Sequence, residues 1–397
     1  MCLREGLLKF KKKGNIVFIC LIALFIMAGL ARTIIFPKDV NYYENRYSKK
    51  ILAPTAKNIL DSTFQNSIEE ALADQIPFAQ RFKKFYNDVT SGFSSFWITP
   101  ILNENDDVYI NYKSGIKIFG GYYVYGAYEL ESVKSGFQTK AQNYNAIFKK
   151  YPDIEFYVYY IERDVDLDLE SGEKVNMDEY LFSLLDLDAS RKRSFEIDSF
   201  EEFAEYFYKT DHHWKHKGSY VAYKDVAKFL GCEGEFVKAG KEVLISKEFA
   251  GSKASTAGSN MITEPFYAYE YEFPTFKSIT GELGEYGKQQ EILSMAPVSS
   301  ISYGEYYGSD DGEVIFDTGK ENLDNILVIG ESFDNAILKL LATHFNKTHS
   351  IDLRTYEHYQ GSKFDFEKYV EEKNIDKVLF IGNVNFYDLS TFVLENY

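Results

Sequence analysis

The C-terminal part of the chain alternates between short apolar runs and amphipathic segments, with few residues between them. Three runs have the length of buried strands, and the two segments between them have helical spacing. Strands and helices that alternate through such short connections form a parallel sheet with helices on both faces. We therefore expect an α/β fold. The segments are NILVIG (325–330), DNAILKLLATHF (334–345), HSIDLRTY (349–356), DFEKYVEEKN (365–374) and KVLFIGN (377–383).

Three stretches extend this pattern towards the N-terminus. IEFYVYYI (154–161) is a continuous apolar and aromatic run that follows a helical segment, which predicts another buried strand. SFEEFAEYFYK (199–209) opens with a serine that is followed three residues later by a glutamate, a capping box that predicts the start of a helix. HKGSYVAYKDVAKFLG (216–231) predicts an amphipathic helix that is closed by its final glycine.

The remaining regions are less regular. Apolar residues four apart, at positions 60, 64, 68 and 72, predict a helical juxtamembrane segment over 37–95. We place the main domain at 96–397. Within it, 263–322 is acidic and tyrosine-rich without a helical period. We interpret 263–322 as an insert of short strands and surface loops.

The N-terminus has the pattern of a membrane anchor. Residues 1–14 carry five Lys/Arg and one acid, and the next 17 residues carry no charge. Apolar character continues to position 36, so 15–36 is expected to form a single transmembrane helix or uncleaved signal-anchor. The basic tail would stay in the cytoplasm and the rest of the chain outside. Cleavage after Gly29-Leu30-Ala31 is the alternative.

Charge and cysteine content restrict the classes of function. The chain has 44 Lys/Arg and 60 Asp/Glu, and the first 32 residues hold six of the bases and one of the acids. The expected exported part is therefore strongly acidic and would repel nucleic-acid phosphates. Of three cysteines only Cys232 lies outside the N-terminal segment, so no intrachain disulfide is expected in that part.

Polar residues follow the predicted strands at the edge where α/β sheets bind ligands. Glu331 and Ser332 follow the first C-terminal strand, Arg354 follows the second, and Asn383 and Asn385 follow the third. A serine at a strand-to-helix turn can expose its hydroxyl to the backbone N–H groups of the next helix, as an acyl-transfer nucleophile requires. The alternative is that Ser332 is only a helix N-cap.

A histidine cluster supplies the base that a serine nucleophile needs. The stretch KTDHHWKHKGSY (209–220) holds three of the six histidines. In an extended segment Asp211 and His213 would point the same way and His212 the opposite way. Asp211 could then orient His213, which could take the Ser332 proton. Trp214 could shield this pair from water or form a platform for a sugar ring.

Two other interpretations of the cluster stay open. Asp211, His212 and His213 could supply metal ligands, although no second cluster with ligand spacing and no CxxC or HExxH motif is present. The cluster could also be structural, without any catalytic role. We expect no metal and no cofactor.

At these residues the sequence resembles a known family. TDHHW matches the signature of the bacterial DHHW proteins, which are similar to AlgX/AlgJ-type alginate O-acetyltransferase proteins, a branch of the SGNH hydrolases. The resemblance spans most of the expected exported chain. It is carried also by YYENRYSKKILAP (42–54), ALADQIPFAQRF (71–82), EFAGSKASTAG (248–258), ILVIGESFDNAILKLL (326–341) and SIDLRTY (350–356).

The resemblance implies an SGNH-hydrolase-like parallel sheet with flanking helices. It also implies that Ser332 is the nucleophile, His213 the base and Asp211 the orienting acid. The chain departs from the pattern in two places: Glu331 stands where Asp is usual, and the Gly-x-Asn-Asp block is not matched. Candidates for oxyanion or substrate contacts are therefore Gly251, Arg354, Asn383, Asn385, His212 and Trp214.

The sequence analysis leads to one principal function and one rival. We expect a membrane-anchored, extracytoplasmic O-acetyltransferase or acetylesterase that acts on a cell-surface or secreted polysaccharide. Family resemblance suggests a membrane-bound O-acyltransferase as acetyl donor. The rival is a non-catalytic polysaccharide-binding or assembly factor with the same fold.

Overall fold

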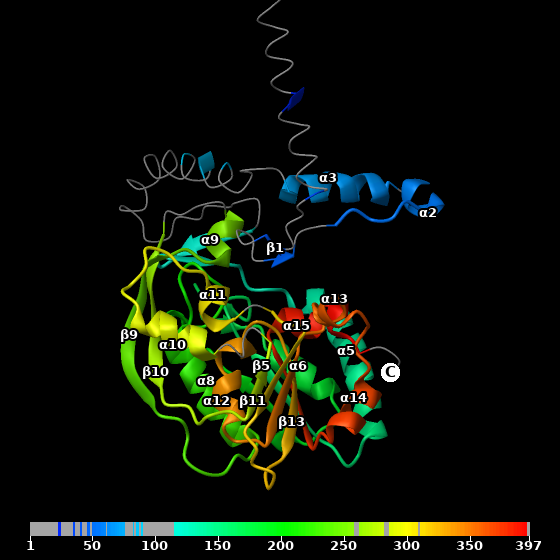
Figure 1. The fold of residues 1–397 in the computed structure, drawn as a ribbon, viewed down its shortest axis with the longest axis vertical. Coiled ribbons are helices and arrows are strands. Elements are labelled where there is room, and N and C mark those ends of the chain that lie inside the picture. The colour runs from blue at the N-terminus through cyan, green and yellow to red at the C-terminus, as the bar shows by residue number, and fades with distance from the viewer. Residues whose placement is uncertain are drawn as a thin grey trace, which may run out of the picture. The chain divides into compact units, whose positions relative to one another are not determined.

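The computed structural model describes residues 50–60, 62–75, 115–257, 262–281, 286–308 and 310–394, with isolated positions before residue 90. The chain divides into two compact units, Met1–Phe96 and Trp97–Tyr397. Figure 1 labels their elements along the chain.

The first unit contains two short strands and two helices among its described residues: β1 (Val40–Asn41), β2 (Arg46–Tyr47), α2 (Ala56–Leu60) and α3 (Thr63–Gln75). Between the helices, Ser62 has a φ of 64°, in the left-handed region, and this interrupts the continuous helix that the apolar spacing predicts. The Leu52 N–H donates to Ser67 Oγ at 3.2 Å and ties the preceding segment to α3. Helix is therefore present in the predicted juxtamembrane segment, with a break between α2 and α3.

The expected membrane helix over 15–36 lies almost entirely outside the described residues. Within the described part of the chain, no helix has both the length and the apolar character needed to cross a bilayer.

A seven-stranded sheet forms the centre of the second unit, in the order β11-β12-β14-β13-β15-β5-β8. The five strands from β14 to β8 are parallel, as expected, and β12 and β11 add an antiparallel edge. The strands are β5 (Glu155–Ile161), β8 (Lys192–Phe195), β11 (Ser278–Thr280), β12 (Glu313–Asp317), β13 (Asn325–Ile329), β14 (Lys347–Ile351) and β15 (Lys377–Gly382).

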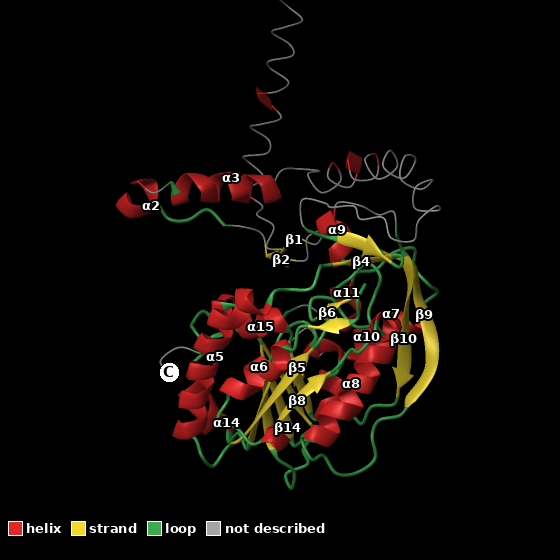
Figure 2. Cartoon of the chain, turned by 180° about the vertical axis from the view of Figure 1, so that it is seen from behind, coloured by secondary structure: helices red, strands yellow, loops and turns green. Residues whose placement is uncertain are grey.

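Side chains alternate along each strand and therefore point to both faces of this sheet. Both faces are buried. On β5, Tyr157 and Tyr159 join one apolar cluster, and Phe156 and Val158 join the other. Figures 1 and 2 show helices on both sides of the sheet. The first cluster includes side chains of α7 (Phe200–Tyr206), α8 (His216–Phe229) and α12 (Leu338–Ala342), and the second those of α5 (Leu130–Lys150), α6 (Met177–Leu184), α14 (Phe366–Lys373) and α15 (Val384–Asp388).

The helix boundaries agree with the sequence signals in most respects. The Ser199 side chain accepts the backbone N–H of Glu202, and α8 is followed by Gly231 with a φ of 70°. The Glu202 carboxylate, however, accepts from Asp198 and not from the cap residue. The helix expected over 334–345 is only a 3-10 turn (Asp334–Ala336) and the short α12.

The region 263–322 contains the expected short strands and, in addition, two helices, and buried residues lie near both of its ends. It contributes β10 (Glu264–Tyr271), β11, α10 (Tyr286–Ser294), α11 (Tyr303–Tyr307) and β12. β10 pairs with β9 (Ala239–Phe249) as an antiparallel hairpin. Tyr303, Tyr306 and Tyr307 of α11 are buried against this hairpin or its neighbours, so the tyrosines here serve as core residues.

The smaller elements of the second unit complete the loops. They are β3 (Lys117–Phe119), β4 (Tyr122–Val124), β6 (Leu167–Asp168), β7 (Glu173–Lys174), α9 (Ser252–Ala257), α13 (Tyr356–Gln360) and the 3-10 turns Ala189–Arg191 and Ser390–Phe392.

Candidate functional site

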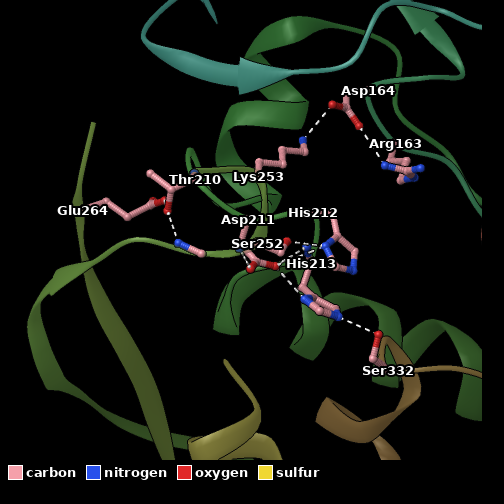
Figure 3. A network of polar contacts seen from close by, with 11 residues as sticks. Arg163, Asp164, Thr210, Asp211, His212, His213, Ser252, Lys253, Glu264 and Ser332 are labelled. Carbon is pink, nitrogen blue, oxygen red and sulfur yellow. Dashed lines mark hydrogen bonds and ion pairs between the residues drawn. The ribbon is translucent and has the colours of Figure 1, made fainter. Parts of the chain in front are cut away.

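Ser332 lies at the turn that follows β13, and its hydroxyl faces the histidine segment. Ser332 Oγ is 2.7 Å from His213 Nε2, although 119 positions separate the two residues in the sequence. Figure 3 shows this contact. The residue before the 3-10 turn is Phe333, so Ser332 is not the cap of a helix. The spatial arrangement that the sequence predicted is therefore present.

Asp211 holds the other edge of the His213 ring. Its Oδ1 is 2.6 Å from His213 Nδ1 and also accepts the His213 backbone N–H at 2.9 Å. This double contact fixes both the backbone and the ring of the histidine. With Nδ1 facing a carboxylate, Nε2 is left to accept a proton from Ser332.

The histidine segment is bent and not extended, which corrects one expectation. His212 does not point away from His213: the two ring centroids are 3.9 Å apart and the planes are inclined by 35°. The side chain of His212 is 32% exposed, whereas that of His213 is buried. His212 therefore lies at the rim of the site, beside the base.

The start of α9 closes around the Asp211 carboxylate. The Ser252 backbone N–H donates to Asp211 Oδ2 at 2.7 Å, and Gly251 lies so close that a Cβ there would stand 2.3 Å from the same oxygen. Burial alone would raise the pKa of Asp211. The charge that His213 carries when it is protonated, together with these hydrogen bonds, outweighs burial and holds the pKa of Asp211 well below its ordinary value. Asp211 is therefore a carboxylate at neutral pH.

His212 is held in a neutral form. Its Nδ1 is 2.5 Å from Ser252 Oγ, a contact drawn in Figure 3. Burial lowers the pKa of His212 well below its ordinary value, and the neighbouring His213 charge lowers it further. An uncharged imidazole beside His213 does not repel a proton on His213.

Aromatic side chains surround the base. Trp214 is fully buried and packs edge to face on Phe333 at 5.3 Å. A fully buried indole cannot stack on a sugar ring, so Trp214 shields the site and is not a sugar platform. The Tyr303 ring stacks on His213 from α11, with centroids 3.9 Å apart.

Buried ion pairs support this loop from behind. Lys253 Nζ is 2.7 Å from Asp164 Oδ2, and Asp164 Oδ1 is 3.3 Å from Arg163 Nη1. Both residues of the Lys253–Asp164 pair have almost no exposed surface. Because an uncompensated buried charge is costly, this pair fixes α9 against the loop that follows β5.

A second contact anchors the chain just before the triad. Glu264 Oε1, at the start of β10, accepts the Thr210 backbone N–H at 3.0 Å. Figure 3 includes both supporting contacts.

The candidate oxyanion donors differ in their availability. The Gly251 N–H donates to Thr210 Oγ1 at 3.1 Å, and the Arg354 guanidinium binds Asp352 at 2.6 Å and Asp310 at 3.0 Å. Gly251 is thus a packing position beside Asp211, and Arg354 is committed to carboxylates.

The two asparagines lie together after β15. Asn383 caps α15 by accepting the Asn385 N–H at its Oδ1, 2.8 Å away. The Asn385 N–H is therefore occupied, while the Asn383 Nδ2 amide remains a possible donor. Glu331 Oε1 accepts the backbone N–H of Asn383 at 3.0 Å and joins this turn to the nucleophile turn. The glutamate at this position thus has a structural use for its longer side chain.

Comparison of the sequence with protein-family models and with curated proteins gives no match. Comparison of structures does. PatB1 of Bacillus cereus, in a structure with a sulfonyl adduct, aligns with a TM-score of 0.52 and 20% identity over 70% of this chain and 96% of that chain. The second unit of the chain therefore shares its fold with PatB1.

Two further solved structures are more distant. A DHHW family protein from Eubacterium siraeum aligns with a TM-score of 0.49 and 14% identity, over 72% of this chain and 97% of that chain. The O-acetyltransferase domain of Pseudomonas putida AlgJ aligns with a TM-score of 0.36 and 9% identity, over 72% of this chain and 91% of that chain.

The contacts of the histidine segment restrict its use as a metal site. Asp211, His212 and His213 each offer one ligand atom within 4.8 Å of the others. The same atoms already make the hydrogen bonds described above: Asp211 Oδ1 and Oδ2 accept from backbone N–H groups, and both His213 nitrogens have partners. An ion would have to displace these bonds, so the absence of a metal stays our prediction.

Several residues of the site were not predicted from the sequence. Ser252 and Lys253 fall in the glycine-serine stretch that supports the family resemblance, so a signal existed for them. Phe333 directly follows Ser332 in the quoted block 326–341, so a signal existed for it too. Asp164 and Tyr303 reach the site through long-range packing and carry no local motif.

Proposed function

We propose that the second unit is a serine-dependent O-acetyltransferase or acetylesterase of the SGNH type, with Ser332, His213 and Asp211 as its catalytic triad. The observation that supports this most is the continuous line from Ser332 Oγ to His213 Nε2 at 2.7 Å and from His213 Nδ1 to Asp211 Oδ1 at 2.6 Å. A buried carboxylate, an imidazole and a serine in this order are the parts of a serine acyl-transfer site.

The proposed reaction has two halves. In the first, Ser332 Oγ attacks the carbonyl carbon of an acetyl ester while His213 Nε2 takes the hydroxyl proton. The carbon–oxygen bond to the leaving group then breaks, and His213 returns the proton to the departing oxygen. In the second half a sugar hydroxyl or water attacks the acetyl-serine. His213 takes the proton of that attacking group and returns a proton to Ser332 Oγ as the acyl bond breaks.

The negative oxygen of each tetrahedral intermediate needs hydrogen-bond donors. We assign this role to the Asn383 Nδ2 amide, because Asn383 lies at the carboxyl end of β15 with its Oδ1 already engaged by the Asn385 N–H. The Glu331 contact to the Asn383 backbone would hold that amide beside the nucleophile turn.

The substrate class is supported by the sequence motifs and by the fold. TDHHW and the blocks that accompany it resemble DHHW and AlgX/AlgJ-type proteins, and we propose acetyl groups of a cell-surface or secreted polysaccharide as the substrate. The PatB1 structure contains a sulfonyl adduct. Since sulfonyl reagents modify activated serines, the same reagent class is a suitable probe for Ser332.

The proposed location follows from the N-terminal sequence. The basic tail and the apolar stretch 15–36 favour a single-pass anchor with the second unit outside the membrane. The proposed acetyl donor, a membrane-bound O-acyltransferase, rests on the resemblance to AlgX/AlgJ-type proteins.

The non-catalytic binding factor remains the rival. Glu331 stands where the family has Asp, and this departure favours the rival function. The contact of Glu331 with Asn383, however, supplies a structural use for the glutamate. The two functions differ in one measurable respect: a binding factor would retain a polysaccharide without turning over any ester.

The first test is a single substitution. Ser332→Ala in the purified protein should reduce hydrolysis of a generic acetyl ester by about a thousandfold or more, since it removes the attacking oxygen. Ser135→Ala, at an exposed position of α5, is the matched control and should leave the rate unchanged. Full activity of the Ser332→Ala variant would remove Ser332 from the mechanism.

A further inference from the structure

Tyr303 lies face to face with the base of the triad. Its ring and that of His213 have centroids 3.9 Å apart and planes inclined by only 4°. Tyr303 opens α11, whose start is fixed by a complete capping box: Ser302 accepts the Glu305 N–H, and the Glu305 carboxylate accepts the Ser302 N–H. A residue at the first position of a capped helix is held in a defined place.

The other side of the imidazole is also covered. The His212 ring lies 3.9 Å away and Phe333 lies 5.0 Å away, both measured between centroids. His213 is thus packed between Tyr303 and two further rings. Rotation of the imidazole about its ring axis would break the contacts of Nδ1 with Asp211 and of Nε2 with Ser332.

The helix that presents Tyr303 is tied to the nucleophile side of the molecule. Gln289 Nε2 donates to the Tyr306 carbonyl at 2.9 Å, and Lys339 Nζ donates to Gln289 Oε1 at 3.0 Å. Lys339 belongs to α12, which follows the Ser332 turn. The contacts link α10, α11 and α12, so the position of Tyr303 is coupled to the segment that carries the serine.

We propose that Tyr303 is a positioning residue for His213: its ring holds the imidazole plane in line between Asp211 and Ser332, and its π face stabilises the imidazolium formed during acyl transfer. This inference rests on the proposed function. An aromatic face within about 6 Å attracts a cation, and the attraction is stronger where water is excluded. Tyr303 is buried, so its face is shielded from water.

The surroundings of Tyr303 keep its phenol uncharged, so it does not compete with Asp211 for the proton on His213. Burial raises the pKa of Tyr303 well above its ordinary value, with further contributions from Tyr307, Asp211 and Asp334, so its phenol stays protonated. The groups that face the pair are Asp211 on the same segment, His212 beside it, Asp334 after the nucleophile, and Arg163 and Lys253, which act on His212. Asp211 is the only one of these in direct hydrogen-bond contact with His213.

The test compares three substitutions of Tyr303 with one control substitution. Tyr303→Phe keeps the ring and removes a hydroxyl that interacts with the Trp214 indole without hydrogen-bond geometry. Tyr303→Leu removes the ring, and Tyr303→Met is the second ring-free variant should the first fail to fold. Tyr306→Leu is the matched control, because Tyr306 lies on the same helix with the same 5% exposure as Tyr303.

Two readouts separate positioning from a merely structural role. The first is the pH profile of kcat/KM for acetyl-ester hydrolysis. The second is the midpoint of the His213 ring signals in a histidine NMR titration, assigned by their loss in His213→Gln. The NMR midpoint does not depend on turnover, so it decides the inference even if the wild-type protein proves inactive and the proposed function fails.

Loss of the Tyr303 ring should change both the rate and the two midpoints. Tyr303→Leu or Tyr303→Met should lower the plateau rate about tenfold and move the acid limb and the NMR midpoint to lower pH by about half a unit, because the imidazolium loses its aromatic partner. Tyr303→Phe should match the wild type, and Tyr306→Leu should lower thermal stability without moving either midpoint. An unchanged midpoint in the ring-free variants, or an equal shift in Tyr306→Leu, would overturn the inference.

Discussion

Gly251 shows how one residue can determine the geometry of the triad without taking part in chemistry. A Cβ at this position would stand 2.3 Å from Asp211 Oδ2 and 2.3 Å from Asp211 Cβ, distances that real Cβ atoms do not tolerate. Asp211 is held there by the Ser252 N–H and by His213, so it cannot move away without loss of a hydrogen bond.

We predict that Gly251→Ala lowers ester hydrolysis by about tenfold to a hundredfold, since displacement of the carboxylate misorients the imidazole. The measurement is kcat/KM of the purified variant. Gly126→Ala is the control, because a Cβ at Gly126 meets nothing within 4 Å. Equal activity of the two variants would show that Asp211 is not held as tightly as the contacts indicate.

At the level of single residues, the sequence identified three side chains that the structure brings into contact. Asp211, His213 and Ser332 could be selected because each stands in a local pattern: a histidine cluster with an adjacent acid, and a serine at a strand-to-helix turn. The direction of His212 was wrong because the prediction assumed an extended backbone, whereas the segment bends and stacks the two rings. Tyr303 was missed because stacking across 90 positions leaves no local signal.

At the level of elements, the hairpin of β9 and β10 is more than a peripheral addition. β10 begins with Glu264, whose carboxylate accepts the Thr210 N–H next to the triad segment. Burial raises the pKa of Glu264 to about 7, against the lowering effects of Lys215 and of hydrogen bonds. The hairpin thus contributes a buried acid that titrates in the physiological range.

The raised pKa of Glu264 makes the stability of the fold depend on pH. Between pH 4.5, the ordinary pKa of the free carboxyl, and about 7, folded Glu264 keeps a proton that the unfolded chain releases. Its contribution to stability is therefore fully present below pH 4.5 and is lost as the pH rises through about 7.

Glu264→Gln removes this titration and keeps an acceptor for the Thr210 N–H. The free energy of unfolding of the variant relative to the wild type should rise between pH 5 and pH 8 by something on the order of 1 kcal/mol. Urea denaturation at the two pH values measures it. A difference that stays constant, or that falls, would contradict the assignment.

The element predictions were most accurate where hydrophobic period and strand length agreed. The buried strands β5, β13 and β15 were located within a residue or two, since continuous apolar runs bounded by turns have few other interpretations. Region 263–322 contains the expected short strands, but the burial of Tyr303, Tyr306 and Tyr307 in the core was not predicted, because a tyrosine-rich composition does not distinguish core from surface. Aromatic residues with a polar tip are compatible with both environments.

At the level of the whole molecule, the features that support the proposed function all lie in the second compact unit. The sheet, its two apolar clusters, the triad and the supporting ion pair all belong to Trp97–Tyr397. Such a unit has its own core and can be expected to fold alone.

We therefore predict that a protein limited to residues 97–397 unfolds in one cooperative transition and hydrolyses a small acetyl ester within about threefold of the full-length rate. Thermal denaturation followed by circular dichroism, together with the ester assay, provides the measurement. Aggregation or loss of the transition would show that the first 96 residues complete the fold.

The central claim is that the Ser332 hydroxyl is activated by His213 and Asp211. Its most direct test is intact-mass and peptide mass spectrometry after treatment with an aromatic sulfonyl fluoride. We predict one sulfonyl group per chain, attached to Ser332, with labelling slowed by at least about a hundredfold in His213→Ala. No adduct on the folded protein, or an adduct at another residue with Ser332 unmodified, would contradict the claim.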